Sequence, residues 1–217
     1  MRRGLIADTV RSARNAYLCI LFQHPLHPQA QSIELLWIST TYTLISAYRD
    51  AVARIEATLP APGSGARANK DALSHLRTTL SRFRQALVKE AAFYHSLITR
   101  IVTFHRLQDR TAPYLAEVNI PVGPGEDAED DPSLAPHLSK EELDKKIDIV
   151  YKGLICLGDL ERYKEQYSDK ARKERDGAPA KNGREPAERF NKAIMYYEVA
   201  RGLQPDNGEL TTPLAES

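Results

Sequence analysis

The chain has 217 residues, 42% of them hydrophobic and 27% charged, a composition typical of a globular protein with one large domain. Its net charge is +1, with basic residues gathered between 70 and 110 and acidic ones between 117 and 144, so charge alone selects no class of partner. No apolar run reaches the roughly 18 residues that cross a membrane and no signal-peptide pattern is found, which predicts a cytoplasmic and/or nuclear protein without a membrane partner.

Two helical segments are expected in the first 60 residues. The first runs from about Leu5 to Phe22 and stops before Pro25, because proline removes a backbone donor and restricts the residue before it. The second starts near Gln31 and stops at Pro60. Its apolar stripe predicts a largely buried indole for Trp37, and the other members are Leu44, Ile45, Tyr48, Val52 and Ile55.

The third segment has the clearest helical period. Apolar residues alternate spacings of three and four along it: Leu73, Leu76, Leu80, Phe83, Leu87, Tyr94, Leu97, Ile101 and Phe104. This pattern predicts one helix of about 35 residues, well beyond the usual length of about 12, which needs a partner along its whole length.

An acidic segment over residues 118–138 interrupts the helical pattern with prolines, glycines and five carboxylates, and we expect an exposed, mobile loop there. The next helix begins after Ser139, which forms a predicted capping box with Glu142. No convincing alternating strand pattern is found, and the fold class predicted is all-α.

The last two helices match the tetratricopeptide pattern. In that pattern a Leu-Gly pair on the first helix is followed by Ala, an aromatic residue, Ala and Pro on the second. Leu157-Gly158 matches the pair, and the second helix matches with Ala193, Tyr197, Ala200 and Pro205 at the spacings of the repeat. Gly158 would let the helices approach closely while Tyr197 fills the space between them. The two halves are separated by a charged segment over residues 168–189, interpreted as a loop of about 23 extra residues inserted within one repeat.

Four blocks of sequence resemble the N-terminal domain of the Est-like and SMG-like family, which serves telomerase and nonsense-mediated mRNA decay. The blocks are Leu36-Trp37 with Tyr42 and Tyr48-Arg49, then Phe93–Ile98, then Leu154–Glu165, then Tyr196-Tyr197 with residues 203–208. The resemblance covers roughly residues 31–208, and its most specific part is the Gly-Asp-x-x-Arg-Tyr motif that ends at Tyr163.

The resemblance implies a 14-3-3-like antiparallel helical array with degenerate tetratricopeptide repeats, forming a single domain over residues 1–208 with a tail over 209–217. Some relatives bind phosphorylated Ser/Thr peptides, typically from the RNA helicase of mRNA decay, and others recruit or activate telomerase. Relatives also carry a second helical domain after this one, so we expect an abbreviated protein or a fragment.

The resemblance also implies a phosphate-binding pocket. Arg162 and Tyr163 match the phosphate ligands of the motif, and Arg49 falls where 14-3-3 proteins place a second arginine. The pocket lysine falls at Tyr42 or Thr43, neither of which is charged, so we expect a weaker pocket.

Plainer interpretations stand beside this pocket. Arg162 can pair with Asp159 three residues earlier on the helix surface, and Tyr42 and Tyr94 can be core or half-buried aromatic residues. The basic helix over 70–110 can be a solvated face, or it can contact RNA or a telomerase ribonucleoprotein. The function predicted is a phosphopeptide-binding adaptor of mRNA decay; the alternatives are a telomerase-associated factor and a helical scaffold with an empty pocket.

Neither an enzyme nor a cofactor is expected. The sequence contains no nucleophile with a base, no Gly-rich phosphate loop and no paired carboxylates at catalytic spacing. His95 and His105 lie ten residues apart on one helix and cannot share a zinc ion, so no metal site is predicted. Cys19 and Cys156 stand in apolar runs, which predicts buried free thiols in a reducing compartment.

The insertion predicts a dispensable segment. Replacing residues 168–188 with a short Gly/Ser turn should leave the melting temperature almost unchanged, because the segment has no apolar stripe and loop-closure entropy grows only with the logarithm of length. Thermal denaturation followed by circular dichroism tests this expectation. A loss of many degrees would show that the segment packs against the domain.

Overall fold

The computed structural model describes residues 2–24, 32–60, 70–122, 139–168 and 189–204, and for residues 2–8 and 32 it describes the backbone alone. Within these ranges the regular structure is helical throughout, so the all-α prediction is confirmed for them. The helices are α1 (Arg2–Gln23), α2 (Ser32–Leu36), the π-helical turn η1 (Trp37–Tyr42), α3 (Thr43–Glu56), α4 (Lys70–Phe104), α5 (Gln108–Glu117), α6 (Lys140–Gln166) and α8 (Asn191–Leu203).

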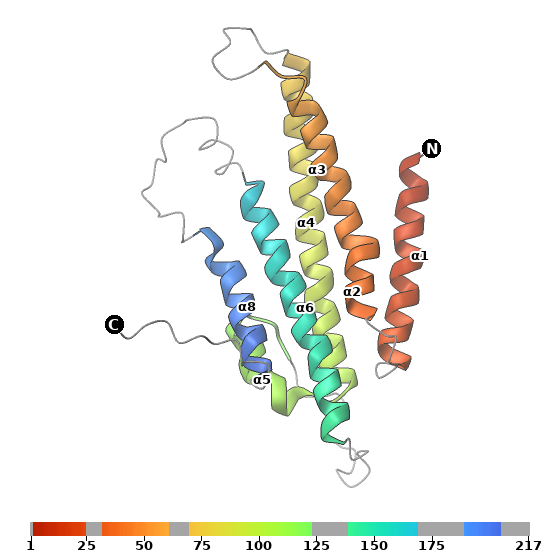
Figure 1. Cartoon of the computed structure of the whole chain (residues 1–217), viewed down its shortest axis with the longest axis vertical. Coiled ribbons are helices and arrows are strands. Elements are labelled where there is room, and N and C mark those ends of the chain that lie inside the picture. Colours follow the sequence, from red (N-terminus) through yellow and green to blue (C-terminus); the bar gives the residue numbers. More distant parts are fainter. Residues whose placement is uncertain (1, 25–31, 61–69, 123–138, 169–188, 205–217) are drawn as a thin grey trace, which may run out of the picture.

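The long helices form one antiparallel array. Figure 1 shows α1, the continuous α2–η1–α3 rod, α4, α6 and α8 side by side, each running opposite to its neighbour. The closest packing is between α6 and α8, followed by α4 with α6 and α3 with α4, while the short α5 lies against the end of α8. The array therefore has α4 and α6 at its centre and α1 and α8 at its edges.

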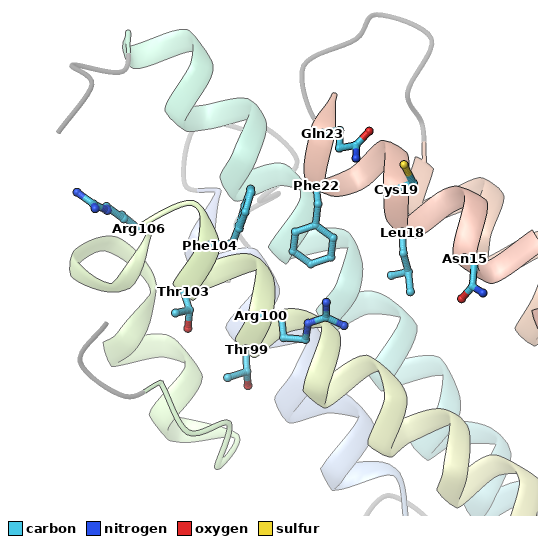
Figure 2. A pocket seen from close by; sticks show the side chains of 10 residues that line it. All are labelled: Asn15, Leu18, Cys19, Phe22, Gln23, Thr99, Arg100, Thr103, Phe104 and Arg106. Carbon is cyan, nitrogen blue, oxygen red and sulfur yellow. The ribbon is translucent and has the colours of Figure 1, made fainter. Parts of the chain in front are cut away.

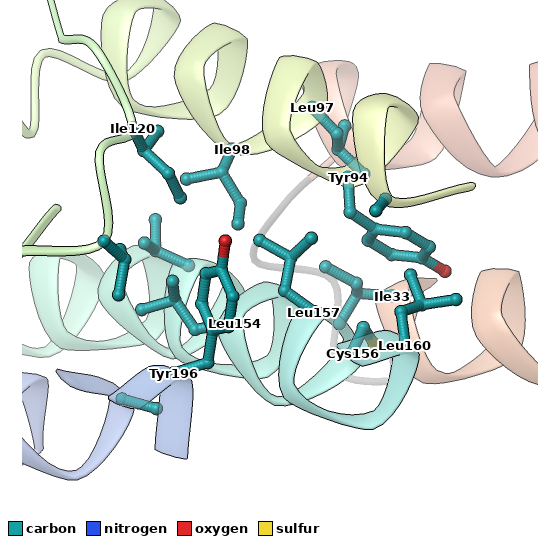
Figure 3. Close-up of a cluster of buried hydrophobic side chains, with 14 of the residues drawn as sticks. Ile33, Tyr94, Leu97, Ile98, Ile120, Leu154, Cys156, Leu157, Leu160 and Tyr196 are labelled. Carbon is teal, nitrogen blue, oxygen red and sulfur yellow. The ribbon is translucent and has the colours of Figure 1, made fainter. Parts of the chain in front are cut away.

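The central helix α4 agrees with its sequence pattern. It spans Lys70–Phe104, 35 residues, and its apolar stripe is buried along almost its entire length. The facing stripe of α6 completes the core between Ile98, Leu154 and Leu157, which Figure 3 shows together with Tyr196 of α8. The start of α6 is also as expected, since the Ser139 side chain accepts from the Glu142 amide and Glu142 accepts from the Ser139 amide.

The second segment departs from a regular helix. Residues 37–42 form a π-helical turn, and inside it the Thr40 hydroxyl donates to the Leu36 carbonyl at 2.6 Å. The wider turn changes which residues face the core. Thr40 and Thr41 are fully buried, whereas Trp37 is half-buried and meets the Tyr94 ring edge-on at 5.8 Å. The prediction that Trp37 lies largely in the core is therefore wrong, because its side chain is only half-buried.

Three further features differ from the sequence expectations. Helix α5 was not predicted, and it forms around an internal Pro113 because Thr111 and Leu115 are buried against the array. The predicted acidic loop begins later than residue 118, since Ile120 is also buried, and residues 123–138 lie outside the described part. Cys156 is buried as expected, but Cys19 is exposed because α1 is an edge helix that contacts the array along one side.

The close approach predicted for the repeat helices is confirmed. A methyl group built on Gly158 of α6 would lie 2.4 Å from Cε1 of Tyr197 on α8, closer than any real contact, so only glycine fits there. Ala193 and Ala200 of α8 are buried on the same interface. The inserted segment, which lies between these helices in sequence, and the tail over 209–217 fall outside the described residues apart from Ser168 and Arg189.

This contact predicts a strong coupling between two positions. Gly158→Ala should destabilise the domain by about 1–3 kcal/mol through overpacking. In a Tyr197→Ala background the same change should instead be neutral or stabilising, by up to about 1 kcal/mol, because alanine has the higher helix propensity and the ring is gone. Chemical denaturation of the four proteins measures the cycle, and equal effects of Gly158→Ala in both backgrounds would contradict the packing described.

Candidate functional site

The four residues predicted to bind phosphate lie on two separate stretches of helix. Tyr42 ends η1 and Arg49 lies seven residues further along the same rod, and both side chains are exposed. Arg162 and Tyr163 lie near the C-terminal end of α6, where Arg162 is exposed and Tyr163 is only 7% exposed. These two stretches flank α4, so a common site requires them to meet across that helix.

Phe83 of α4 brings the two stretches together. Its ring is fully buried; Tyr48 of α3 stacks on it with centroids 5.0 Å apart, and Tyr167 at the end of α6 contacts it edge-on at 4.8 Å. Tyr48 precedes Arg49 in the chain, and Tyr167 follows Tyr163 by about one helical turn. The aromatic cluster therefore places Arg49 beside the end of α6.

Three tyrosines surround Arg49 closely enough to act on its charge. Burial by itself would lower the pKa of Arg49, but interactions with Tyr167, Tyr163 and Tyr42 outweigh it, so the pKa is raised. Three of the four predicted residues, Tyr42, Arg49 and Tyr163, are thus gathered in one place.

Arg162 lies over the ring of Tyr163. Its guanidinium lies 4.7 Å from the centre of the Tyr163 ring, and its Nη2 and Nε donate to Oδ1 of Asp159 at 3.1 and 3.3 Å. The pairing with Asp159 that the sequence left open as an alternative is therefore present. Burial lowers the pKa of Arg162, but the Asp159 carboxylate outweighs it and holds the pKa above its usual value.

The two arginines consequently share one tyrosine. Tyr163 touches the Arg162 guanidinium with its ring and acts on Arg49 with its phenol. Guanidinium groups are the side chains best suited to a phosphate, because each presents paired donors that match two phosphate oxygens. Both guanidinium groups are therefore of the type that binds phosphate, and Arg162 already donates two hydrogen bonds to Asp159.

Sequence reasoning missed two members of this site. Tyr167 contacts Phe83 and Arg49. The sequence feature that could have identified it is its position four residues after Tyr163, on the same helical face. Tyr197 of α8 donates to Asp159 Oδ1 at 2.9 Å. Burial and this hydrogen bond raise the pKa of Tyr197 to about 12, so its hydroxyl remains a donor at neutral pH.

A buried carboxylate beside the site was also missed. Glu161 is 6% exposed and accepts hydrogen bonds from Lys164 at 2.8 Å and from Lys192 of α8 at 3.0 Å. Burial alone would raise the pKa of Glu161, but the two ammonium groups outweigh it and hold the pKa below its usual value. This triad ties the first turn of α8 to the last turns of α6.

The other chemical candidates are separated in space or paired within the core. His95 lies 2.9 Å from the Tyr196 hydroxyl, whereas His105 stacks on Phe22. Among the residues that the structure describes, no three His, Cys, Asp or Glu side chains are grouped so as to hold a metal ion. In the same part of the chain, no helix combines the length and the apolar character needed to span a bilayer.

Comparison with known protein families gives one match. The family model described as Telomerase activating protein Est1 matches residues 31–168, the stretch from α2 to α6 that contains all four predicted site residues. That region of the family is its 14-3-3-like helical domain, which agrees with the array in Figure 1. No curated protein and no solved structure matches the chain.

The Glu161 triad predicts a pH-dependent contribution to stability. Because the folded pKa of Glu161 lies below its unfolded value of about 4.5, the triad stabilises the fold at neutral pH and loses this effect as pH falls through the folded pKa. Glu161→Gln should therefore cost about 1–3 kcal/mol at pH 7 and progressively less below pH 4. Denaturant titrations at pH 7 and below pH 4 measure the free energy of unfolding of the wild type and the variant. Glu141→Gln, which removes an exposed pair with Lys145, is the control and should change little.

Proposed function

The chain belongs to the Est1 family of telomerase activating proteins, and on that basis we propose that its helical domain is a non-catalytic adaptor that binds a phosphorylated Ser/Thr peptide. The partner proposed is a factor of nonsense-mediated mRNA decay such as its RNA helicase, met in the cytoplasm and/or the nucleus. The observation that supports this proposal best is the gathering of Arg49, Tyr42 and Tyr163 between α3 and the end of α6, with Arg162 over the Tyr163 ring.

In this proposal the two arginines supply the charge. A phosphoserine adds nearly two negative charges and three strong acceptors, which two guanidinium groups can distinguish from a serine hydroxyl by electrostatics alone. Arg49 is exposed and lies among phenols rather than carboxylates, and it forms a side-chain hydrogen bond with Tyr167. Arg162 is paired with Asp159, so part of its contribution is offset by the cost of loosening that pair.

Tyr42 determines how strong the pocket is. Its side chain is 40% exposed, and by the resemblance the lysine of a 14-3-3 pocket falls at Tyr42 or Thr43, so the proposed site has two cations rather than three. Each charge-assisted contact contributes roughly 1.5–3 kcal/mol net, and losing one corresponds to roughly a tenfold to hundredfold weaker complex. We expect micromolar rather than nanomolar affinity for a phosphopeptide.

A second candidate function is a telomerase-associated role, which the description of the matching family favours. In that role the same site would hold a segment of a telomerase protein or ribonucleoprotein instead of a decay factor. The two candidates share the adaptor chemistry and differ in the partner, so the choice between them depends on which phosphorylated sequence binds.

The test uses paired phosphorylated and unphosphorylated peptides from decay factors and from telomerase proteins. Isothermal titration calorimetry should detect binding of the phosphorylated peptide and none of its unphosphorylated counterpart. Either Arg162→Glu or Arg49→Ala should weaken binding of the phosphorylated peptide at least tenfold. Arg110→Glu, at an exposed position on α5 at the other end of the array, controls for the change in overall charge. The melting temperature of Arg162→Glu should stay near that of the wild type, because an exposed ion pair contributes little.

Two results would count against the phosphate pocket. Equal affinity for the phosphorylated and unphosphorylated peptides would show that the site does not recognise the phosphate. Full binding by Arg162→Glu together with Arg49→Ala would place the ligand elsewhere. Either result would favour a helical scaffold with an empty pocket.

A further inference from the structure

A cleft lies between α1 and the C-terminal end of α4, at the edge of the array (Figure 2). Its volume is about 950 Å³, near the upper end of the range of about 300–1,000 Å³ for ligand sites. The four residues of the candidate phosphate site lie on η1, α3 and α6, and none of them lines this cleft. The cleft is therefore a separate surface of the domain.

The cleft exists because α1 and α4 are joined by long side chains. Helix α1 packs closely on α2 and η1, but within the described ranges its backbone does not approach α4 as closely. The Arg14 guanidinium reaches Glu90 of α4 at 2.8 Å, and the Phe22 ring meets the Phe104 ring edge-on with centroids 5.3 Å apart. These side chains span the space between the two helices, which leaves a cleft open to solvent beside them.

Each wall of the cleft is one face of a helix. The lining residues of α1 recur at steps of three and four, which is the spacing of a single helical face, and they are Asn15, Leu18, Cys19, Phe22 and Gln23. Those of α4 also share one face, and they are Thr99, Arg100, Thr103 and Phe104. Figure 1 shows α1 and α4 running in the same direction. Two such faces form a channel whose shape accepts a third helix.

The cleft exposes an aromatic ring. Phe104 is 61% exposed, although most large apolar side chains of α4 are buried, and Leu18 and Phe22 beside it are half-buried. Apolar side chains of a partner would remove this surface from water, which favours association. The wall from residue 15 to residue 23 is about 12 Å long, at about 1.5 Å per residue, so it matches about two turns of a bound helix.

The cleft carries a cation and no acid. Arg100 is exposed, and its guanidinium lies 5.1 Å from the centre of the Phe22 ring. Among the described residues that line the cleft there is no aspartate or glutamate, and residues 9–23 and 91–106 contain none. A basic partner would find no opposite charge on these walls, whereas a carboxylate can pair with Arg100.

We propose that the α1–α4 cleft binds an acidic amphipathic helix of a partner protein, with its apolar side chains on Phe104, Phe22 and Leu18 and a flanking carboxylate on Arg100. A helix places side chains at i, i+4 and i+7 on one face, which matches the spacing of both walls. An extended peptide would direct every second side chain away from the cleft. This second surface is independent of the proposed phosphate site.

The test uses a fluorescently labelled peptide of about 15 residues, or about four helical turns, with leucines along one face and glutamates beside them. One control peptide has lysine in place of each glutamate, and another has the same composition with its leucines scattered around the helix. Fluorescence anisotropy with the full chain should detect binding of the first peptide alone, and added salt should weaken it. The peptide should also slow the reaction of Cys19 with iodoacetamide, since Cys19 is an exposed thiol that lines the cleft and Cys156 is buried.

Two variants test the contacts. Phe104→Ala should weaken binding roughly tenfold because it removes the apolar surface that the helix covers, whereas Val88→Ala, 57% exposed on α4 outside the cleft, is the matched control. Arg100→Glu should weaken binding of the glutamate peptide roughly tenfold and allow the lysine peptide to bind. Arg82→Glu, at an exposed position in the N-terminal half of α4, should change neither. Thermal denaturation of each variant checks that the domain stays folded.

Several results would overturn the proposal. Failure of the glutamate peptide to bind, or equal binding of the peptide with scattered leucines, would show that the cleft does not accept an amphipathic helix. Loss of binding in Arg162→Glu would place the peptide at the proposed phosphate site, whereas unchanged binding in that variant supports a separate surface. Equal protection of Cys19 by a single-stranded RNA would assign the cleft to a different class of ligand.

Discussion

The arrangement of the candidate phosphate site depends on the packing around Phe83. This ring lies in the middle of the long helix α4, fully buried, with Tyr48 of α3 stacked on it and Tyr167 at the end of α6 against its edge. Helices α3 and α6 lie on either side of α4, and the aromatic cluster brings the upper end of α6 to the middle of α3. Arg49 and Tyr163 are more than one hundred residues apart in sequence. They become neighbours because Tyr48, next to Arg49, and Tyr167, four residues after Tyr163, both contact the Phe83 ring.

Two buried carboxylates hold the edge helices to the central pair. Glu90 of α4 accepts hydrogen bonds from Arg14 of α1 at 2.8 Å and from Thr41 of η1 at 2.6 Å, and Glu161 of α6 accepts from Lys164 and from Lys192 of α8. A carboxylate removed from water is costly unless several donors surround it, so each one favours a single position of the edge helix over its alternatives. The apolar stripes supply the stability of the array, and these two polar clusters add selectivity for its register.

The proposed phosphate site between α3 and α6 combines exposed arginines with tyrosine hydroxyls and one competing carboxylate, Asp159, a set of groups that suits a compact dianion.

The sequence by itself determined the helical class, the extent of α4, the start of α6 and the glycine contact at Gly158, because periodicity, a capping box and a repeat motif are all local signals. It also pointed to Arg49 and Arg162, through resemblance to a family. Only the tertiary structure decided the π-helical turn at Trp37, the formation of α5 around Pro113, and the exposure of Cys19 on an edge helix. The tertiary structure also decided the contact between Tyr167 and Phe83. Each of these four features depends on contacts between segments distant in sequence, where burial outweighs local propensity.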